Sequence, residues 1–242
     1  PAHGPGSSCG KNLGPNTFST IGEEKKTNYA LQPQTQEAFI SAVTHGLHSA
    51  PVYFAINAKI NQQGYENIYD VKSKGTQLLS IDEFKAAAKQ DCIILDTRHA
   101  AEFTEGFIPG SVFVGLEGRF AEWAATVLPF DKSMILVTAP GKEEESVIRL
   151  TRVGFDKMLG CLKGGFETWQ LAGEPVDMII NVEADELAMD IPHDPNLLVV
   201  DVRKETEYAA EHVEEAYNRP LAYINDWIKD INPEEHFFLH CA

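Results

Sequence analysis

Short apolar runs alternate with helical patterns along most of the chain. The runs Cys92–Leu95, Met134–Val137 and Met158–Leu162 are hydrophobic almost throughout, without the alternation typical of a half-exposed strand. Between and around them, apolar residues recur at helical spacing. The expected helices begin near Ser80, surround Trp123 and cover about 144–153 and 166–171. Hydrophobic strands separated by helices are typical of a parallel sheet covered by helices on both faces, so the pattern predicts an α/β fold.

The first 76 residues follow a different pattern. Residues 1–28 are rich in Gly, Pro, Ser and Asn and predict a loop. Apolar residues at helical spacing predict two short helices, one within Thr35–Leu47 and one from Val52 to Ile60. The polar stretch from Asn61 to Thr76 contains glycines and is typical of a linker into a new domain.

The sequence also repeats itself. Asp96-Thr97-Arg98 and Asp201-Val202-Arg203 each close an apolar run, 105 positions apart. Further matches follow in the same order, the last two at an offset of 104: Glu102-Phe103 with Glu207-Tyr208, Ile108 with Val213, Trp123 with Trp227, and Pro129 with Pro233. This shared order predicts a duplicated unit. The expected domains are residues 1–76, residues 77–177 as one complete unit, and residues 178–242 as the first half of a second.

The charge balance narrows the range of partners. Lys and Arg total 20 against 36 Asp and Glu, which gives a formal net charge of -16. Such a chain repels phosphate backbones and anionic lipids, so we expect neither nucleic acid nor a membrane as a partner. No apolar run has the roughly 18 residues of a membrane span and no signal peptide is recognisable, which predicts a cytoplasmic protein. Because the chain starts at Pro1 and stops at Ala242, directly after an apolar run, we expect both ends to be cut.

The four cysteines lie far apart and form no CxxC pair, which argues against a zinc knuckle or a disulfide framework and favours reduced thiols. Cys92 and Cys161 have apolar neighbours and are expected in the core. Cys241 follows the apolar run Phe237–Leu239 and therefore lies at the carboxyl end of a predicted parallel strand, where ligand sites of α/β sheets lie. A following helix N-terminus would favour the thiolate there. The alternative is an inert, buried thiol.

The second unit resembles the amino-terminal half of a rhodanese domain. The resemblance is carried by residues 197–203, Glu207-Tyr208, His212-Val213, Pro220-Leu221 and His240-Cys241. Rhodaneses carry sulfane sulfur as a cysteine persulfide, so the resemblance implies that Cys241 is the nucleophile and that Asp201 and Arg203 brace the active-site loop. A purely structural ion pair is the other interpretation of Asp201 and Arg203.

The first unit resembles the same family from about Gln77 to Val176 but departs from it at the catalytic position. The run Ile135–Thr138 should lead to the cysteine, and the chain continues instead with Ala139-Pro140-Gly141-Lys142 and three glutamates. Alanine cannot accept sulfur, and the glutamates oppose a bound anion. We therefore expect the first unit to be catalytically silent, with a structural or docking role. The glutamates also suit the first turn of a helix, where each contributes roughly 0.3–1 kcal/mol.

The opening segment resembles the carboxyl-terminal tail of a metallo-β-lactamase-fold domain of the kind fused to rhodanese domains. The resemblance is carried by residues 1–10, with His3, and by Ser19–Glu24 and Asn28–Leu31. Relatives include iron-dependent persulfide dioxygenases and two-metal thiol-ester hydrolases, so the resemblance implies iron or zinc in that domain, with His3 at or beside the metal. The rhodanese units need no cofactor. The His-x-His-x-Asp-His motif that would anchor the metal is absent from this sequence, and one histidine cannot hold a catalytic metal.

Together these resemblances predict sulfane-sulfur handling by a metallo-β-lactamase-fold/rhodanese fusion. Sulfurtransferase chemistry is expected at Cys241, and persulfide oxidation or thiol-ester hydrolysis in the metal domain. The expected partners are small sulfur compounds such as thiosulfate or glutathione persulfide, and a second copy of the chain. Two alternatives stay open: a non-catalytic binding or dimerisation module, and a cysteine-dependent phosphatase or arsenate chemistry that uses a longer loop after the cysteine.

Overall fold

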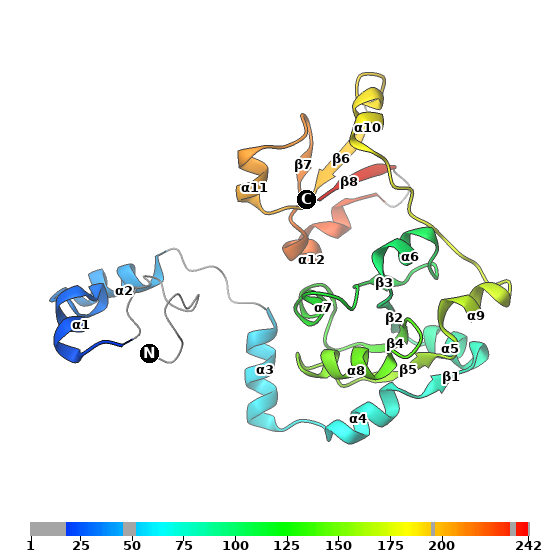
Figure 1. The fold of residues 1–242 in the computed structure, drawn as a ribbon, viewed down its shortest axis with the longest axis horizontal. Helices are drawn as coiled ribbons and strands as arrows, with labels where there is room; N and C mark the ends of the chain where they lie inside the picture. The colour runs from blue at the N-terminus through cyan, green and yellow to red at the C-terminus, as the bar shows by residue number, and fades with distance from the viewer. Residues whose placement is uncertain (1–17, 46–51, 195–196, 233–235, 242) are drawn as a thin grey trace. The chain divides into compact units, whose positions relative to one another are not determined.

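The computed structural model describes residues 18–45, 52–194, 197–232 and 236–241. The chain divides into two compact units, residues 1–50 and residues 51–242. In Figure 1 the strands of the described residues all belong to the second unit, and both of its sheets have helices beside them. Throughout the described residues, every helix is too short or too polar to cross a membrane.

The amino-terminal unit contains helices, and one of them lies within residues 1–28, for which the sequence predicts a loop. Helix α1 (Ile21–Thr27) is followed by the 3-10 helix η1 (Tyr29–Leu31) and by α2 (Gln36–Thr44). The loop prediction for residues 1–28 is therefore wrong over α1. Helix α1 forms because the Thr20 side chain caps its first turn, while acidic residues in the first turn and lysines in the last complement the helix dipole. Composition alone does not reveal such a cap.

The predicted linker also contains a helix. Helix α3 (Val52–Gln63) is followed by α4 (Ile68–Gly75), whose first turn is capped by Asn67. Val71 is 4% exposed and belongs to the hydrophobic core, so α4 is part of the folded unit and does not act as a linker. The prediction failed because α4 is mostly polar, and its stability comes from one buried edge that packs on the sheet.

The first sheet has five parallel strands in the order β1-β5-β4-β2-β3. The strands are β1 (Leu78–Leu79), β2 (Cys92–Asp96), β3 (Val112–Phe113), β4 (Ser133–Val137) and β5 (Met158–Leu162). Five helices alternate with them: α5 (Ile81–Ala88), α6 (Ala100–Glu105), α7 (Phe120–Val127), α8 (Glu143–Thr151) and α9 (Gly165–Leu171). The predicted α/β fold with a parallel sheet is confirmed.

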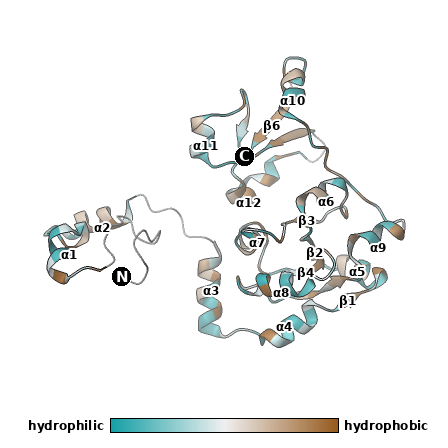
Figure 2. Ribbon diagram, in the orientation of Figure 1, coloured by the Kyte–Doolittle hydropathy of each residue, from teal (hydrophilic) through white to brown (hydrophobic). Residues whose placement is uncertain are grey.

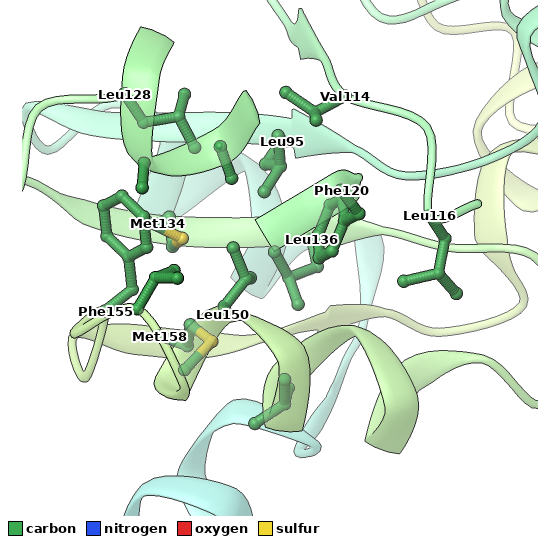
Figure 3. Packing of buried hydrophobic residues seen from close by; sticks show 14 of the residues in the cluster. Leu95, Val114, Leu116, Phe120, Leu128, Met134, Leu136, Leu150, Phe155 and Met158 are labelled. Carbon is green, nitrogen blue, oxygen red and sulfur yellow. The ribbon is translucent and has the colours of Figure 1, made fainter. Parts of the chain in front are cut away.

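Both faces of this sheet are buried, as the continuous hydrophobic strands predict. On β4, Met134 and Leu136 join a cluster with side chains of α4, α7 and α8. Figure 3 shows part of this cluster, with Phe120 and Leu150 beside the sheet. Ile135 points to the opposite face and joins a cluster with side chains of α5 and α9. Side chains of each strand point alternately to the two faces of the sheet, which gives two hydrophobic cores separated by one sheet. Figure 2 shows apolar residues along the strands and polar residues on the outer helices.

The second sheet has three parallel strands in the order β7-β6-β8. They are β6 (Leu198–Asp201), β7 (Tyr217–Asn218) and β8 (Phe237–His240). The accompanying helices are α10 (Ala184–Asp190), α11 (Glu205–Ala210), η2 (Leu221–Tyr223), α12 (Ile224–Trp227) and η3 (Ile228–Asp230). Strand β6 lies between β7 and β8 as β2 lies between β3 and β4, which confirms the duplicated topology.

The two tryptophans that match in the sequence differ in their burial. Trp123 on α7 is 38% exposed, whereas Trp227 is 7% exposed and its indole N–H donates to the Pro220 carbonyl at 3.0 Å. The reason is a change of local structure. Helix α7 has two turns and buries Phe120 and Ala124, while the second unit has short helical turns, and Trp227 is the buried residue of α12.

Candidate active site at the carboxyl edge of the second sheet

The Asp201–Arg203 pair forms directly after strand β6. The guanidinium Nε donates to both carboxylate oxygens of Asp201 at 3.1 Å, and Nη2 donates to Oδ2 at 2.6 Å. Nη2 also donates to the Glu211 carbonyl at 2.8 Å, at the end of α11. The Asp201 side chain is fully buried and that of Arg203 is 16% exposed. The pair therefore ties the strand end to the end of the next helix.

The ion pair holds both groups in their charged forms. Hydrogen bonds from Arg203 lower the pKa of Asp201 below its ordinary value of 3.8, and this effect exceeds the opposing effect of burial. The hydrogen bond with Asp201 raises the pKa of Arg203, and the charges of Asp201, Glu207 and Cys241 add to that increase. Arg203 is thus a permanent cation within electrostatic reach of the Cys241 sulfur.

The first unit contains the same ion pair in the same geometry. Arg98 Nε lies 3.0 Å from both carboxylate oxygens of Asp96, and Nη2 donates to Oδ2 at 2.7 Å and to the Gly106 carbonyl at 2.7 Å. Gly106 ends α6 as Glu211 ends α11. The guanidinium also lies 4.1 Å from the centre of the Phe166 ring. This pair occurs in a unit that has no counterpart of Cys241. It can therefore brace the loop after the strand whether or not the unit is catalytic.

Asn218 is a positioning residue that the sequence analysis missed. Its side-chain amide donates to the Asp201 carbonyl at 3.1 Å and to the Arg203 carbonyl at 3.0 Å. The backbone adds a bond from the Arg219 N–H to the Asp201 carbonyl at 2.8 Å. Asparagine is uncommon in strands, so its presence in a short strand was the one sequence feature that could have indicated a special role. In the first unit Phe113 occupies this place, because it lies opposite Asp96 as Asn218 lies opposite Asp201.

Cys241 directly follows strand β8, at the carboxyl edge of the sheet. His240 lies opposite Asp201 in the strand register, and its carbonyl accepts the Val202 N–H at 3.0 Å. Cys241 is exposed in this structure. The structure therefore brings all three predicted residues, Cys241, Asp201 and Arg203, to one edge of the sheet.

Strand register corrects the predicted counterpart of Cys241 in the first unit. Asp96 lies opposite Val137, and Asp201 lies opposite His240. The first residue after the strand is therefore Thr138 in one unit and Cys241 in the other, and the pairing of Cys241 with Ala139 is wrong by one position. The sequence predicts the catalytic position at the residue after Thr138. The strand register instead assigns that position to Thr138 itself. Threonine, like alanine, cannot hold sulfane sulfur as a persulfide.

Comparison with known families agrees with this geometry. The family model described as the Rhodanese-like domain matches residues 80–172 and 183–242, which is more than half of the chain. The chain belongs to the rhodanese-like family. The two matched segments correspond to the two sheets, so both units are rhodanese-like domains, the first with threonine and the second with cysteine after the equivalent strand.

Several solved structures are similar to this rhodanese-like chain. The rhodanese-like domain of a protein from Anabaena sp. is 22% identical over 45% of this chain and 86% of its own length, with a TM-score of 0.37. A thiosulfate sulfurtransferase from Pseudomonas aeruginosa is 20% identical over 72% of this chain and 41% of its own, with a TM-score of 0.33. A metallo-beta-lactamase from Staphylococcus aureus is 26% identical over 66% of this chain and 43% of its own, with a TM-score of 0.46. A search of curated proteins found no match.

The other described thiols of the rhodanese-like chain belong to the core, as predicted. Cys161 on β5 is fully buried, and burial raises its pKa to about 12. Its thiol donates to the Gly75 carbonyl at 3.2 Å. Cys92 on β2 is partly buried, and burial raises its pKa as well. Neither thiol forms a thiolate near neutral pH.

The predicted metal residue cannot be placed in this rhodanese-like chain. His3, like Cys9, lies outside the described residues. Among the residues that the structure does describe, no group of three His, Cys, Asp or Glu side chains could hold a metal ion. The described residues therefore supply no ligand set for an iron or zinc ion.

Proposed function

We propose that the second rhodanese-like unit carries sulfane sulfur as a persulfide on Cys241. The observation that supports this proposal is the exposed thiol at the carboxyl edge of a parallel sheet, one residue beyond the strand position opposite Asp201. Arg203 adds a fixed positive charge nearby. A sulfur atom at this place is accessible to a donor, and the guanidinium attracts an anionic donor toward it.

The transfer has two balanced steps. With thiosulfate as donor, the Cys241 thiolate attacks the outer sulfur, a sulfur–sulfur bond forms to Cys241, and the bond to the sulfite group breaks so that sulfite leaves with the electron pair. The thiolate of a low-molecular-weight acceptor then attacks the outer sulfur of the persulfide and takes it, and the Cys241 thiolate is regenerated. The outer sulfur atom passes from thiosulfate to Cys241 and then to the acceptor, so no external oxidant or reductant is required.

The Asp201–Arg203 pair positions the site in this proposal and does not react. Asp201 is fully buried and directs the guanidinium, while Asn218 fixes the backbone of the same loop. A cation held this firmly attracts both the anionic donor and the thiolate without reorganising during the reaction. We therefore expect loss of Arg203 to weaken sulfur loading without removing the nucleophile.

Mass spectrometry of the full-length protein tests the proposal. After treatment with thiosulfate, a Cys241 peptide should gain about 32 Da, the mass of one sulfur atom, and cyanide should remove this gain as thiocyanate. Cys241→Ser should abolish sulfur transfer, whereas Cys92→Ser serves as a matched control that removes a thiol from the first unit. Unchanged transfer by the Cys241→Ser variant would contradict Cys241 as the sulfur carrier, and a wild-type protein that neither gains nor transfers sulfur would favour a binding or dimerisation module.

A phosphatase-type reaction is distinguishable in the same samples. A cysteine that attacks phosphorus would release phosphate from p-nitrophenyl phosphate and would be blocked by vanadate. Release of phosphate that depends on Cys241, together with no sulfur on Cys241 after thiosulfate treatment, would replace sulfur transfer with this alternative.

The metal-dependent half of the predicted fusion is a separate proposal. We infer from the resemblance of the opening segment that the whole protein also contains an iron- or zinc-dependent persulfide oxidase or thiol-ester hydrolase domain, whose carboxyl-terminal tail includes His3. Metal analysis of the full-length protein, compared with a variant that begins at residue 52, tests it. Equal metal content of the two proteins contradicts it.

A further inference from the structure

Arg219 lies in the same row of residues as Cys241, at the carboxyl edge of the second sheet. Asn218 on β7 and His240 on β8 both lie opposite Asp201 on the central strand β6. The next residue after Asn218 is Arg219, and the next residue after His240 is Cys241. Neighbouring strands lie about 4.8 Å apart, so the backbones at Arg219 and Cys241 are separated by two strand spacings, roughly 10 Å.

The counterpart of Arg219 in the first unit is a core valine. The Arg219 N–H donates to the Asp201 carbonyl at 2.8 Å, and the Val114 N–H donates to the Asp96 carbonyl at 3.0 Å. These equivalent hydrogen bonds identify Arg219 with Val114. Val114 is 7% exposed and belongs to the hydrophobic core, whereas Arg219 is exposed. The unit with the exposed cysteine thus has a cation at a place where the other unit has an apolar core residue.

The guanidinium of Arg219 is unpaired. Within the described part of the chain, it forms no ion pair and no hydrogen bond. Arg203 differs in this respect, because the Asp201 carboxylate binds its guanidinium at 2.6 Å and balances its charge. The donors of Arg219 are therefore available to an external anion, and a planar guanidinium matches a carboxylate because it can donate two parallel hydrogen bonds to it.

The backbone around Arg219 is held in place on both sides. Besides the hydrogen bond of Arg219 itself, the Leu221 N–H donates to the Val202 carbonyl at 3.0 Å. Pro220 lies between them, and a residue before proline is restricted to an extended backbone. The carbonyl of Pro220 accepts the indole N–H of Trp227 at 3.0 Å. The guanidinium therefore extends from a fixed point on the edge of the sheet, at a constant distance from strand β8.

We propose that Arg219 is a specificity-determining residue that binds a carboxylate of the thiol acceptor. This inference rests on the proposed sulfur transfer at Cys241. In thiosulfate the anionic oxygens are bonded to the sulfur atom next to the transferred one, so this donor is a poor match for a cation whose backbone lies roughly 10 Å away. A thiol with a carboxylate several bonds from its sulfur spans this distance. It attacks the outer sulfur of the persulfide as described above, and Arg219 holds its far end.

Sulfur transfer from thiosulfate to two matched thiols tests the inference. The acceptors 6-mercaptohexanoate and 6-mercaptohexanol have the same length and differ in the terminal carboxylate, which lies too far from the thiol to change its reactivity. With KCl present to screen the field of the whole chain, we expect a lower KM for 6-mercaptohexanoate. Arg219→Gln should raise this KM about fivefold without changing kcat. Arg219→Lys retains the charge without the paired hydrogen bonds and should restore part of the preference.

Arg152→Gln is the matched control, because Arg152 is an exposed arginine of the first unit that also has no ion pair among the described residues. It removes the same charge and should leave both KM values unchanged. An unchanged KM of Arg219→Gln for 6-mercaptohexanol shows that this variant is folded.

The mass of the Cys241 peptide after thiosulfate treatment separates this inference from the proposed function. Wild-type protein that gains no sulfur on Cys241 contradicts the proposed function and, with it, the role of Arg219. Wild-type protein that gains and transfers sulfur but has the same KM for the two thiols overturns the role of Arg219 alone. Equal KM values of Arg219→Gln and Arg152→Gln for 6-mercaptohexanoate overturn it as well.

Discussion

The Asp-x-Arg triplets show how one residue pair serves two different sites. In both units the aspartate is fully buried and the arginine reaches the carbonyl at the end of the next helix. The pair is therefore part of the fold, and in the proposed function the chemistry depends on the residue that follows the neighbouring strand. That residue is Thr138 in the first unit and Cys241 in the second.

Removing one partner of the buried pair in the first unit should destabilise the fold. Asp96→Ala leaves the guanidinium of Arg98 buried and unpaired, which costs about 3–5 kcal/mol. Urea denaturation of the chain measures the loss. The control is Asp91→Ala, which removes an exposed partner of Lys132 and should change stability little. Equal stability of the two variants would contradict a structural role for the Asp96–Arg98 pair.

The stabilising effect of Asp201 should depend on pH with a defined sign. Because Arg203 lowers its pKa below 3.8, the folded chain binds fewer protons at this carboxyl than the unfolded chain near that pH. The contribution is complete above about pH 5 and is lost as the pH falls below 3.8 toward the lower folded value. The difference in unfolding free energy between the wild type and Asp201→Asn should therefore shrink in acid. A difference that stays constant or grows on acidification would refute this assignment.

At the scale of elements, helix α4 shows how packing creates structure in a segment that looks like a linker. Gly75, the last residue of α4, lies against the core. A Cβ atom added there would lie 3.0 Å from both Cγ atoms of Val147 and 3.2 Å from Cβ of Met158. The close approach of the helix end to α8 and β5 thus favours a glycine, and Val71 on the same helix lies in the core.

Gly75→Ala tests this packing. The added methyl group overpacks the contact with Val147 and Met158 and should cost about 1–3 kcal/mol, although alanine is the better helix former. The comparison is Gly22→Ala in α1, whose added Cβ meets only the Thr20 hydroxyl at 3.9 Å. Thermal unfolding of both variants provides the measurement. A chain stabilised by Gly75→Ala would mean that α4 does not pack as described.

At the scale of the whole molecule, the net charge of -16 opposes the approach of an anionic sulfur donor. Arg203 provides only local attraction at the proposed site. The long-range field of the chain should therefore slow the loading of Cys241 by thiosulfate, and dissolved salt should reduce this effect because the screening length falls to about 8 Å at physiological ionic strength.

We accordingly expect the rate of persulfide formation from thiosulfate to rise with ionic strength. Stopped reactions followed by mass spectrometry of the Cys241 peptide at increasing concentrations of KCl give the rates. An uncharged organic trisulfide used as donor is the control and should show a much weaker dependence. A rate with thiosulfate that falls with salt would indicate that local attraction by Arg203 exceeds the field of the whole chain.

The sequence by itself determined the fold class, the duplication and the residues of the proposed site. Continuous hydrophobic strands such as Met134–Val137 require burial on both faces, and this requirement is met by a parallel sheet covered with helices. The repeated Asp-x-Arg triplet at strand ends identified equivalent places in both units. These are local patterns of period and order, which a linear sequence records directly.

Only the tertiary structure decided the counterpart of Cys241, the role of α4 and the contacts of Asn218. Each depends on a neighbour far away in the chain. The strand opposite Asp96 identifies Thr138, and the core against Val71 stabilises α4. Asn218 donates to the carbonyls of Asp201, at the end of β6, and of Arg203, in the loop that follows. The periodicity of a sequence shows which side of an element faces the core. It does not show the register at which two distant elements meet, because that register is chosen by side-chain packing and hydrogen bonding in three dimensions.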